Sequence, residues 1–249
     1  ESIEDGKFHA KKQFQDIISY SKKNSSNIHL IGLVSDGGVH SHINHLKEVI
    51  ISLSDVKDKI FIHAFTDGRD VDPKSGVNYI EALENFCKKY GGKLSTVIGR
   101  YFSMDRDNRW DRIKKSFDLI AYGKHQRKTN TISSAVELAY NNNETDEFIS
   151  PTLIGNYSGI EHDDSLMMIN FRADRVRELL SAFINPKFNE FKKNNKSPLI
   201  TNSLGMTEYS EEISSFMKSI FVRDEIKDTL GDMISKANLT QLRLAETEK

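Results

Sequence analysis

Short apolar runs typical of buried strands alternate with amphipathic helical stretches along most of this chain. The runs that we expect to form strands span, in chain order, residues 28–34, 60–65, 94–98, 166–169 and 199–200. In the stretches between them, apolar residues recur three or four positions apart, as at Ile113, Phe117 and Ile120. This alternation favours parallel strands, because a parallel neighbour is reached through a crossover helix. We therefore predict an α/β fold, with a mostly parallel sheet sandwiched by helices in three α/β/α layers.

Three segments depart from this alternation. Residues 129–159 contain a short expected helix at 133–140 but are otherwise polar, and we expect them to form a surface excursion. Residues 185–196 are rich in Lys and Asn, which is typical of a solvated helix end and loop. From Arg223 onward, the apolar positions predict a helix and then the start of a strand at 239–244. We expect the partner sheet of that strand to lie outside this sequence.

The charge balance and the cysteine content exclude several classes of protein. The 35 basic and 36 acidic residues leave a net charge of −1 at pH 7, so we expect no nucleic-acid partner and no membrane partner. No apolar run approaches the roughly 20 residues that span a bilayer. The single cysteine, Cys87, fits a reducing compartment, and it lies on the apolar face of an expected helix. These features favour a cytoplasmic globular protein in which Cys87 is a core residue.

Polar motifs directly follow four of the expected strands. They are SDGGVHSH at 35–42, TDGRD at 66–70, GRYFSMDRD at 99–107 and NFRADR at 170–175. The carboxyl ends of parallel strands meet at one edge of a sheet, where such folds bind ligands. The cationic side chains expected there are His40, Arg69, Arg100, Arg106, Arg172 and Arg175. Because a guanidinium presents a planar fork of donors to carboxylate or phosphate, these motifs predict a site for a small, multiply anionic ligand.

Other interpretations of the same motifs stay open. The first Asp of TDGRD can hold a turn, and the Arg/Asp alternation at 105–112 can be a helix start with ion pairs. The backbone at 36–38 could cradle an anion, and His40, His42 and His45 could be the metal ligands of a hydrolase. The sequence contains no G-x-S-x-G nucleophile elbow and no dinucleotide-binding G-x-G-x-x-G. It therefore favours holding an anion over activating a nucleophile.

Taken in order, the motifs resemble those of the cofactor-independent (2,3-bisphosphoglycerate-independent) phosphoglycerate mutases. The matching stretches are LVSDGGVHSHINHL, FTDGRDVDPKSG, IGRYFSMDRDNRW, INFRADRVREL, MTEY at 206–209 and QLRLAETEK at the end of the chain. They extend from about Ile28 to Lys249, and several are long and unusual. The resemblance is therefore specific and covers nearly the whole chain.

The resemblance implies an activity and a domain organisation. The family belongs to the alkaline-phosphatase superfamily and interconverts 3-phosphoglycerate and 2-phosphoglycerate in glycolysis and gluconeogenesis, through a phosphoserine intermediate. A phosphatase domain carries the serine nucleophile and two Mn²⁺ or Mg²⁺ ions, and an inserted transferase domain binds the glycerate. By this resemblance, residues 1–222 are the transferase domain and 223–249 a return segment into the phosphatase domain. This chain alone is then expected to hold no metal, to need no 2,3-bisphosphoglycerate and to be inactive. Its partner is the phosphatase domain of the same, monomeric polypeptide.

The resemblance also assigns roles to individual residues. It implies substrate binding by His40, Arg69, Asp70, Arg100, Arg106, Arg172, Arg175 and Lys249. Asp70 is also the expected catalytic residue, because its carboxylate can accept a hydrogen bond from a glycerate hydroxyl or take part in proton transfer. Ala173 stands where the family more usually has proline. Two alternatives are kept: a stand-alone phosphoanion-binding module without chemistry, and the metal hydrolase built on the three histidines.

Overall fold

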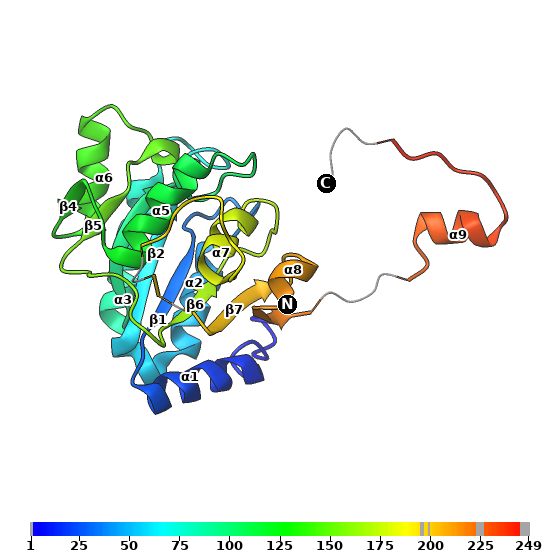
Figure 1. Cartoon of the computed structure of the whole chain (residues 1–249), viewed down its shortest axis with the longest axis horizontal. Helices are drawn as coiled ribbons and strands as arrows, with labels where there is room; N and C mark the ends of the chain where they lie inside the picture. Colours follow the sequence, from blue (N-terminus) through cyan, green and yellow to red (C-terminus); the bar gives the residue numbers. More distant parts are fainter. Residues whose placement is uncertain (1, 195–196, 199, 223–226, 245–249) are drawn as a thin grey trace.

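A single sheet of eight strands lies at the centre of the part of the chain that the structure describes (Figure 1). The computed structural model describes residues 2–194, 197–198, 200–222 and 227–244. The strands are β1 Ile28–Leu33, β2 Ile60–Thr66, β3 Lys93–Gly99, β4 Arg127–Thr129, β5 Thr152–Ile154, β6 Ser165–Met168, β7 Asn202–Thr207 and β8 Lys218–Phe221. Their order in the sheet is β4-β5-β3-β2-β1-β6-β7-β8.

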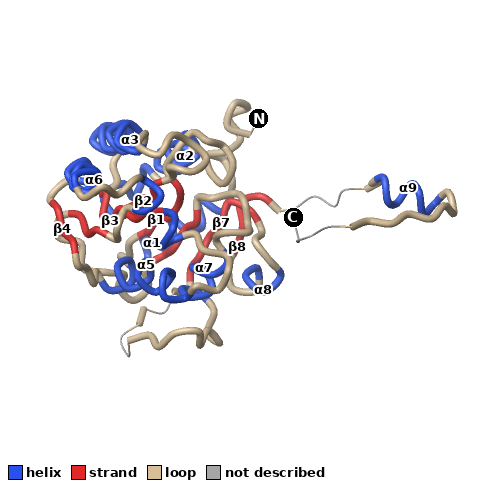
Figure 2. Tube along the Cα trace, turned by 90° about the horizontal axis from the view of Figure 1, so that it is seen from above, coloured by secondary structure: helices blue, strands red, loops and turns tan. Residues whose placement is uncertain are grey.

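Helices cover both faces of this sheet (Figure 2). They are α1 Lys12–Asn24, α2 Ile43–Ser52, α3 Gly76–Tyr90, α4 Arg100–Ser103, α5 Trp110–Tyr122, α6 Ile132–Asn141, α7 Arg177–Ile184, α8 Glu211–Ser214 and α9 Leu230–Lys236, with the 3-10 helices η1 Ser54–Lys59 and η2 Asp146–Phe148. Side chains of α1, α2, α3 and α6 pack on one face, and those of α5 and α7 on the other. The predicted α/β class with three layers is confirmed.

The strand order explains why the loops after β1, β2, β3 and β6 gather at one place. Strand β1 pairs in parallel with β2 on one side, where Leu33 lies opposite Phe65, and with β6 on the other, where Ile31 lies opposite Met168. The chain runs outward from β1 to β2 and β3 and later returns to the other side of β1 as β6 and β7. In open sheets of this kind the ligand crevice lies beyond the carboxyl ends of the strands, where the strand order reverses. That place is the end of β1.

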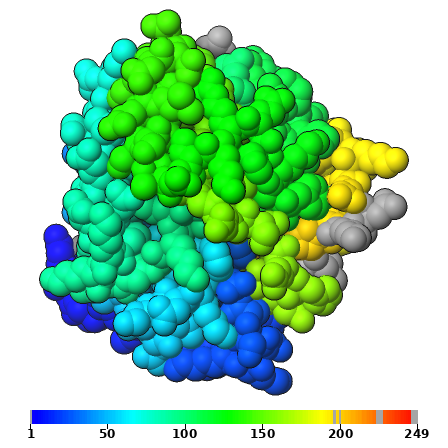
Figure 3. Space-filling model, turned by 90° about the vertical axis from the view of Figure 1, so that its left-hand side faces the viewer, coloured from blue at the N-terminus to red at the C-terminus, as the bar shows by residue number. Residues whose placement is uncertain are grey.

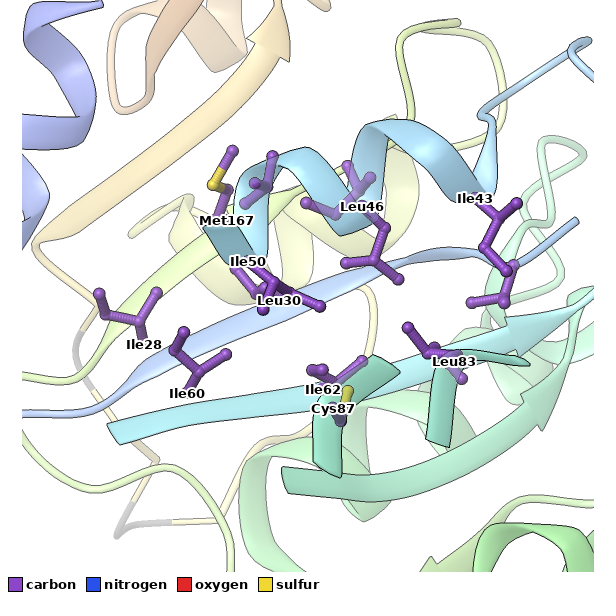
Figure 4. Packing of buried hydrophobic residues seen from close by; sticks show 14 of the residues in the cluster. Ile28, Leu30, Ile43, Leu46, Ile50, Ile60, Ile62, Leu83, Cys87 and Met167 are labelled. Atoms are coloured by element: carbon purple, nitrogen blue, oxygen red, sulfur yellow. The ribbon is translucent and has the colours of Figure 1, made fainter. Parts of the chain in front are cut away.

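Alternate residues of the central strands build the core (Figure 4). Ile28 and Leu30 of β1 and Ile60 and Ile62 of β2 are fully or almost fully buried and lie on the same side of the sheet as α2 and α3. Burial of each such side chain contributes about 1.5–3 kcal/mol to the stability of the folded chain. Cys87 of α3 belongs to the same cluster, and burial, aided by the charge of Glu84, raises the pKa of its thiol to about 12. The prediction of Cys87 as a core residue is confirmed.

The expectation of a surface excursion at 129–159 is wrong in part. The expected helix forms as α6, but β4 and β5 join the sheet on either side of it in the chain. Strand β5 pairs antiparallel with β3, where Leu153 lies opposite Thr96. In Figure 3 the green part of the chain, which includes this segment, forms the upper part of the face in view and is continuous with the rest of the molecule. Three-residue strands carry too few positions for a hydrophobic period, so the pattern did not reveal them.

The strand expected at 199–200 is also misplaced. Leu199 lies outside the described residues, and Ile200 precedes β7, which begins at Asn202. Strand β7 contains the small residues Ser203 and Gly205, so its apolar positions are less conspicuous than the pair before it. The strand is therefore real, but it is shifted toward the carboxyl end of the chain.

The end of the chain carries the expected helix, α9, but residues 239–244 form no strand. Figure 1 draws α9 apart from the sheet, and its apolar side chains are exposed, with Leu230 at 76% and Met233 at 52%. Leu242 and Leu244 are 83% and 87% exposed. Among the described helices, none combines the length and the apolar character needed to cross a membrane.

Candidate anion-binding site

The loops that follow β1, β2, β3 and β6 are joined to one another by backbone hydrogen bonds. The N–H of Val34 donates to the carbonyl of Phe65 at 2.8 Å, which holds the ends of β1 and β2 together. The carbonyl of His40 accepts from the N–H groups of Phe171 at 2.8 Å and Arg172 at 3.3 Å, which ties the loop after β1 to the loop after β6. The predicted convergence of these loops at the carboxyl edge of the sheet is therefore observed.

Asp67 is a buried carboxylate that connects three of these loops. Its Oδ2 accepts from the Ser35 hydroxyl at 2.7 Å, and its Oδ1 accepts from the N–H groups of Arg69 at 3.2 Å and Asp70 at 3.0 Å and from Nη1 of Arg100 at 2.7 Å. Burial opposes ionisation, but these hydrogen bonds and the Arg100 charge outweigh it and hold the pKa of Asp67 below its usual value. The expected turn held by the first Asp of TDGRD is confirmed, and that turn presents Asp70.

Arg100 bridges the two carboxylates of the TDGRD loop. Its Nη1 lies 2.7 Å from Oδ1 of Asp67 and 2.6 Å from Oδ2 of Asp70, and its side chain is only 3% exposed. Burial acts against the guanidinium charge, yet the two carboxylates raise the pKa of Arg100. Within the protein its charge is already compensated. Arg100 therefore holds Asp70 in place, in addition to its predicted contact with a ligand.

His40 lies between two carboxylates without a close hydrogen bond to either. Its Nε2 is 3.8 Å from Oδ2 of Asp70, and its Nδ1 is 3.6 Å from Oδ1 of Asp174. Burial and the charge of Arg100 lower the pKa of His40 to about 4, so the ring is neutral near pH 7. The His40 Nδ1 and Asp174 Oδ1 atoms are both buried and accept or donate no hydrogen bond among the described residues, although Oδ1 of Asp174 forms an ion pair with Arg172. Buried polar atoms of this kind are normally satisfied by a ligand or water.

Asp174 connects His40 to two further arginines of the predicted set. Its Oδ2 accepts from Nη1 of Arg106 at 3.0 Å, and its Oδ1 lies 3.2 Å from Nε of Arg172. Sequence analysis did not select Asp174, although it stands inside the FRADR motif. The spacing of Arg172 and Asp174 was visible in the sequence, but the partnership with Arg106, which is 68 positions away, was not.

A pocket of about 360 Å³ opens beside these groups. Six arginines and three carboxylates are among its lining residues, which are Arg69, Arg100, Tyr101, Met104, Asp105, Arg106, Asp107, Arg109, Arg112, Glu147, Phe148 and Arg175. Four of the predicted arginines therefore share one cavity. The pocket lining does not include three further predicted residues, but ion pairs connect them to it: these are His40, Asp70 and Arg172. The last predicted residue, Lys249, lies outside the described residues.

Two lining arginines that the sequence analysis did not select are held by a buried carboxylate. Nη1 of Arg109 lies 3.2 Å and Nη1 of Arg112 lies 3.4 Å from Oδ1 of Asp105. The guanidinium of Arg112 also lies over the ring of Tyr101, 3.8 Å from its centroid. The alternative interpretation of residues 105–112 as a helix start with ion pairs is thus supported: the ion pairs form, and α5 begins inside this stretch, at Trp110.

Arg175 differs from the other arginines of the pocket. Within the described chain it forms no ion pair with a carboxylate, and its Nη1 donates to the carbonyl of Met104 at 3.0 Å. Burial and the nearby charges of Arg106, Arg100 and Arg69 lower its pKa. A half-buried guanidinium surrounded by like charges is stabilised by an incoming anion. Arg175 is therefore the cation of this pocket that most needs an external partner.

The three histidines do not form a metal site. The Nδ1 of His42 accepts a hydrogen bond from the N–H of Asn44 and so caps the N-terminus of α2. The His45 ring packs against Phe171, with 5.7 Å between the ring centroids. In the described ranges there is no group of three or more His, Cys, Asp or Glu side chains that could hold a metal ion. The metal-hydrolase alternative finds no support in this geometry.

The chain as a whole is similar to proteins of one family. Residues 1–211 match the family model described as "BPG-independent PGAM N-terminus". The chain is 43% identical over 248 residues to the 2,3-bisphosphoglycerate-independent phosphoglycerate mutase of Roseobacter denitrificans, and this match covers 100% of the chain and 48% of that protein. It is 44% identical over 256 residues to the 2,3-bisphosphoglycerate-independent phosphoglycerate mutase 1 of Methanosarcina acetivorans, covering 100% of the chain and 49% of that protein.

A solved structure shows the same fold. A crystal structure of Leishmania mexicana phosphoglycerate mutase at low cobalt concentration matches with a TM-score of 0.85 and 25% sequence identity, over 95% of this chain and 45% of that one. The chain spans about half the length of the curated relatives that it matches, for example 48% of the Roseobacter denitrificans protein. It belongs to the family formed by the N-terminal part of BPG-independent phosphoglycerate mutases.

Proposed function

We propose that this chain is the substrate-binding part of a 2,3-bisphosphoglycerate-independent phosphoglycerate mutase. In this function the arginine-lined pocket holds phosphoglycerate while 3-phosphoglycerate and 2-phosphoglycerate are interconverted. The observation that carries the proposal is Arg175, a half-buried guanidinium without a carboxylate partner in the described chain, beside the charges of Arg69, Arg100 and Arg106. A ligand with both a carboxylate and a phosphate supplies the negative charges that this group of cations lacks.

The residues around the pocket divide the binding task. The anionic groups of the ligand are neutralised by Arg175, Arg106 and Arg69. Arg172 contributes a fourth positive charge once its ion pair with Asp174 is broken. Asp70 has one oxygen engaged by Arg100, and its other oxygen accepts no hydrogen bond within the described chain, so it is free to accept the glycerate hydroxyl. Holding glycerate in this orientation while its phosphate is transferred is a positioning task, which converts an encounter into an intramolecular step.

The chemistry of phosphate transfer belongs, in this proposal, to the half of the enzyme that this chain does not span. We assign the serine nucleophile and the two Mn²⁺ or Mg²⁺ ions to that half, together with the contact that Lys249 makes to the phosphate. Residues 1–222 are then the transferase domain and 223–249 the return segment. The exposed apolar side chains of the return segment, such as Leu230 and Leu242, suit packing against the other domain. The complete enzyme is proposed to be a cytoplasmic monomer.

Ligand titrations of the chain test this function. We expect 3-phosphoglycerate to bind more tightly than glycerol 3-phosphate, which lacks the carboxylate, and than glycerate, which lacks the phosphate. We also expect 2-phosphoglycerate to compete with 3-phosphoglycerate, since the same cations hold both. Equal affinities for 3-phosphoglycerate and glycerol 3-phosphate would show that the pocket recognises phosphate alone and would contradict the proposal.

A further inference from the structure

One carboxylate of the pocket does not come from the loops that carry the arginines. Asp107 pairs with Arg109 of its own loop, where the Nη1–Oδ2 distance is 2.5 Å, and Asp105 pairs with the same residue. Glu147 comes instead from the segment at 146–149, and its Oε1 lies 3.5 Å from Nη1 of Arg69, which is 78 positions away. The presence of this acid in a cavity built from arginines calls for a physical explanation.

The backbone that carries Glu147 is fixed independently of Arg69. The carbonyl of Asp146 accepts from the Thr66 hydroxyl at 2.7 Å, and the carbonyl of Ile149 accepts from the N–H of Gly99 at 2.8 Å. The buried Asp146 carboxylate in turn accepts from the N–H of Gly76 at 2.7 Å and from the Tyr140 hydroxyl at 2.5 Å. These bonds clamp the segment onto the ends of β2 and β3, so Glu147 is held at the pocket whether or not Arg69 contacts it.

Two glycines leave room for this placement. A Cβ added to Gly68 would lie 2.8 Å from the backbone N of Glu147, and one added to Gly99 would lie 2.4 Å from its carbonyl oxygen. Each glycine directly precedes a pocket arginine, Arg69 or Arg100. The absence of a side chain at Gly68 and at Gly99 therefore allows the backbone of Glu147 to lie against both loops.

We propose that Glu147 is a built-in counter-ion that competes with anionic ligands for Arg69 and thereby sets the affinity of the pocket. The inference rests on the proposed function, since it concerns the same site. The Arg69 side chain is 57% exposed, and a single contact at 3.5 Å is weak enough to be exchanged for a bidentate contact with a ligand. A fixed acid also repels every incoming anion. A ligand that offers two anionic groups in the right positions overcomes this repulsion, whereas a small anion does not.

The substitution Glu147→Gln tests this inference in the 249-residue chain. It removes the charge and keeps the shape and the clamped backbone, so we expect the affinity for 3-phosphoglycerate to rise about two- to fivefold, the effect of one partly exposed ion pair. Inorganic phosphate should gain at least as much, because it depends most on the net charge of the pocket. Glu81→Gln, at an exposed position of α3, is the matched control and should leave both affinities unchanged.

A double-mutant cycle identifies Arg69 as the group for which Glu147 competes. In an Arg69→Ala background, the gain from Glu147→Gln should largely disappear, because the competed cation is absent. An affinity that is unchanged or lower in Glu147→Gln, with an unchanged unfolding midpoint, would overturn the inference. Arg175→Ala separates this result from a failure of the proposed function. Loss of binding in Arg175→Ala without a gain in Glu147→Gln contradicts only the counter-ion, whereas unchanged binding in Arg175→Ala contradicts the function itself.

Discussion

Nη1 of Arg100 donates to Oδ2 of Asp70 across 2.6 Å, and this bond joins the loops that follow two neighbouring strands, β2 and β3. Because the same nitrogen also lies 2.7 Å from Asp67, the guanidinium is held from two sides and is almost completely shielded from solvent. The candidate catalytic carboxylate is thus oriented by the protein before any ligand arrives. Such preorganisation lowers the cost of arranging groups at the moment of reaction.

Removal of Asp67 should therefore destabilise the whole fold. We expect Asp67→Ala to lower the free energy of unfolding by about 3–5 kcal/mol, because Arg100 loses one of the two carboxylates that compensate its buried charge. Urea unfolding measures this loss. The control is Asp55→Ala, whose 2.7 Å pair with Lys22 is exposed and contributes about 0–1 kcal/mol. Similar losses for the two variants would contradict the role assigned to Asp67.

The His40 ring should stay neutral well below the pH at which an ordinary histidine gains its proton. Its pKa falls from 6.5 to about 4 in the folded chain, so between these values the unfolded chain binds a proton that the folded chain does not. The contribution of His40 to stability therefore decreases as the pH falls from 6.5 toward 4. An NMR titration of the His40 side chain should give a midpoint near 4, and His40→Gln should remove this part of the acid sensitivity. A midpoint near 6.5 is the contradicting result.

Gly99 should tolerate no side chain. A Cβ there would lie 2.4 Å from the carbonyl oxygen of Glu147 and 2.6 Å from the backbone N of Ile149, so Gly99→Ala must displace the segment at 146–149. We expect a loss of about 3 kcal/mol in unfolding free energy, as for an overpacked core, together with weaker phosphoglycerate binding. At Gly155, φ is +61° and a Cβ would meet no atom within 4 Å, so Gly155→Ala should cost only the backbone strain of about 1 kcal/mol. Binding should distinguish the two variants even if their stabilities are similar, and equal binding would count against the clamp.

Much of this arrangement could be predicted from the sequence, and the limits have physical causes. The central strands and their post-strand motifs were recognisable because burial on both faces of a parallel strand leaves a continuous apolar run, as at 28–34. The arginines were recognisable because they stand directly after such runs. Strand β5 was not, because its pairing with β3 depends on a neighbour that is more than fifty positions away in the chain.

The carboxylates that pair with the arginines were also only partly predictable from the sequence. Local partners follow from spacing, as in the pairing of Arg109 with Asp105, which is four positions away in the loop before α5. Partners such as Glu147 for Arg69 depend on where a distant segment folds back onto the sheet. The sequence therefore predicted four of the six arginines that line the pocket, but not that most of them are already paired. The isolation of Arg175 could be recognised only against that background.

Cys87, the single cysteine of the chain, provides a simple check on the core. With its pKa raised to about 12, the folded chain holds on the order of 10³-fold less thiolate at pH 8 than an ordinary cysteine would. We expect its reaction with a disulfide reagent to be at least about 100-fold slower in the folded chain than in urea. Rapid labelling without unfolding would show that α3 does not pack as described.

The central claim is that Arg175 is the cation left for the ligand, and an NMR titration of the 249-residue chain with 3-phosphoglycerate tests it most directly. Because the site is open to water, we expect a dissociation constant near the millimolar range, on the order of −4 kcal/mol, which weakens as salt is added. Arg175→Ala should weaken binding several-fold, and Arg175→Lys should not restore it, because an ammonium lacks the bidentate fork. Lys192→Ala, at an exposed position outside the pocket, should bind as the unaltered chain does. If Arg175→Ala and Lys192→Ala bind 3-phosphoglycerate equally well, the account of this site is wrong.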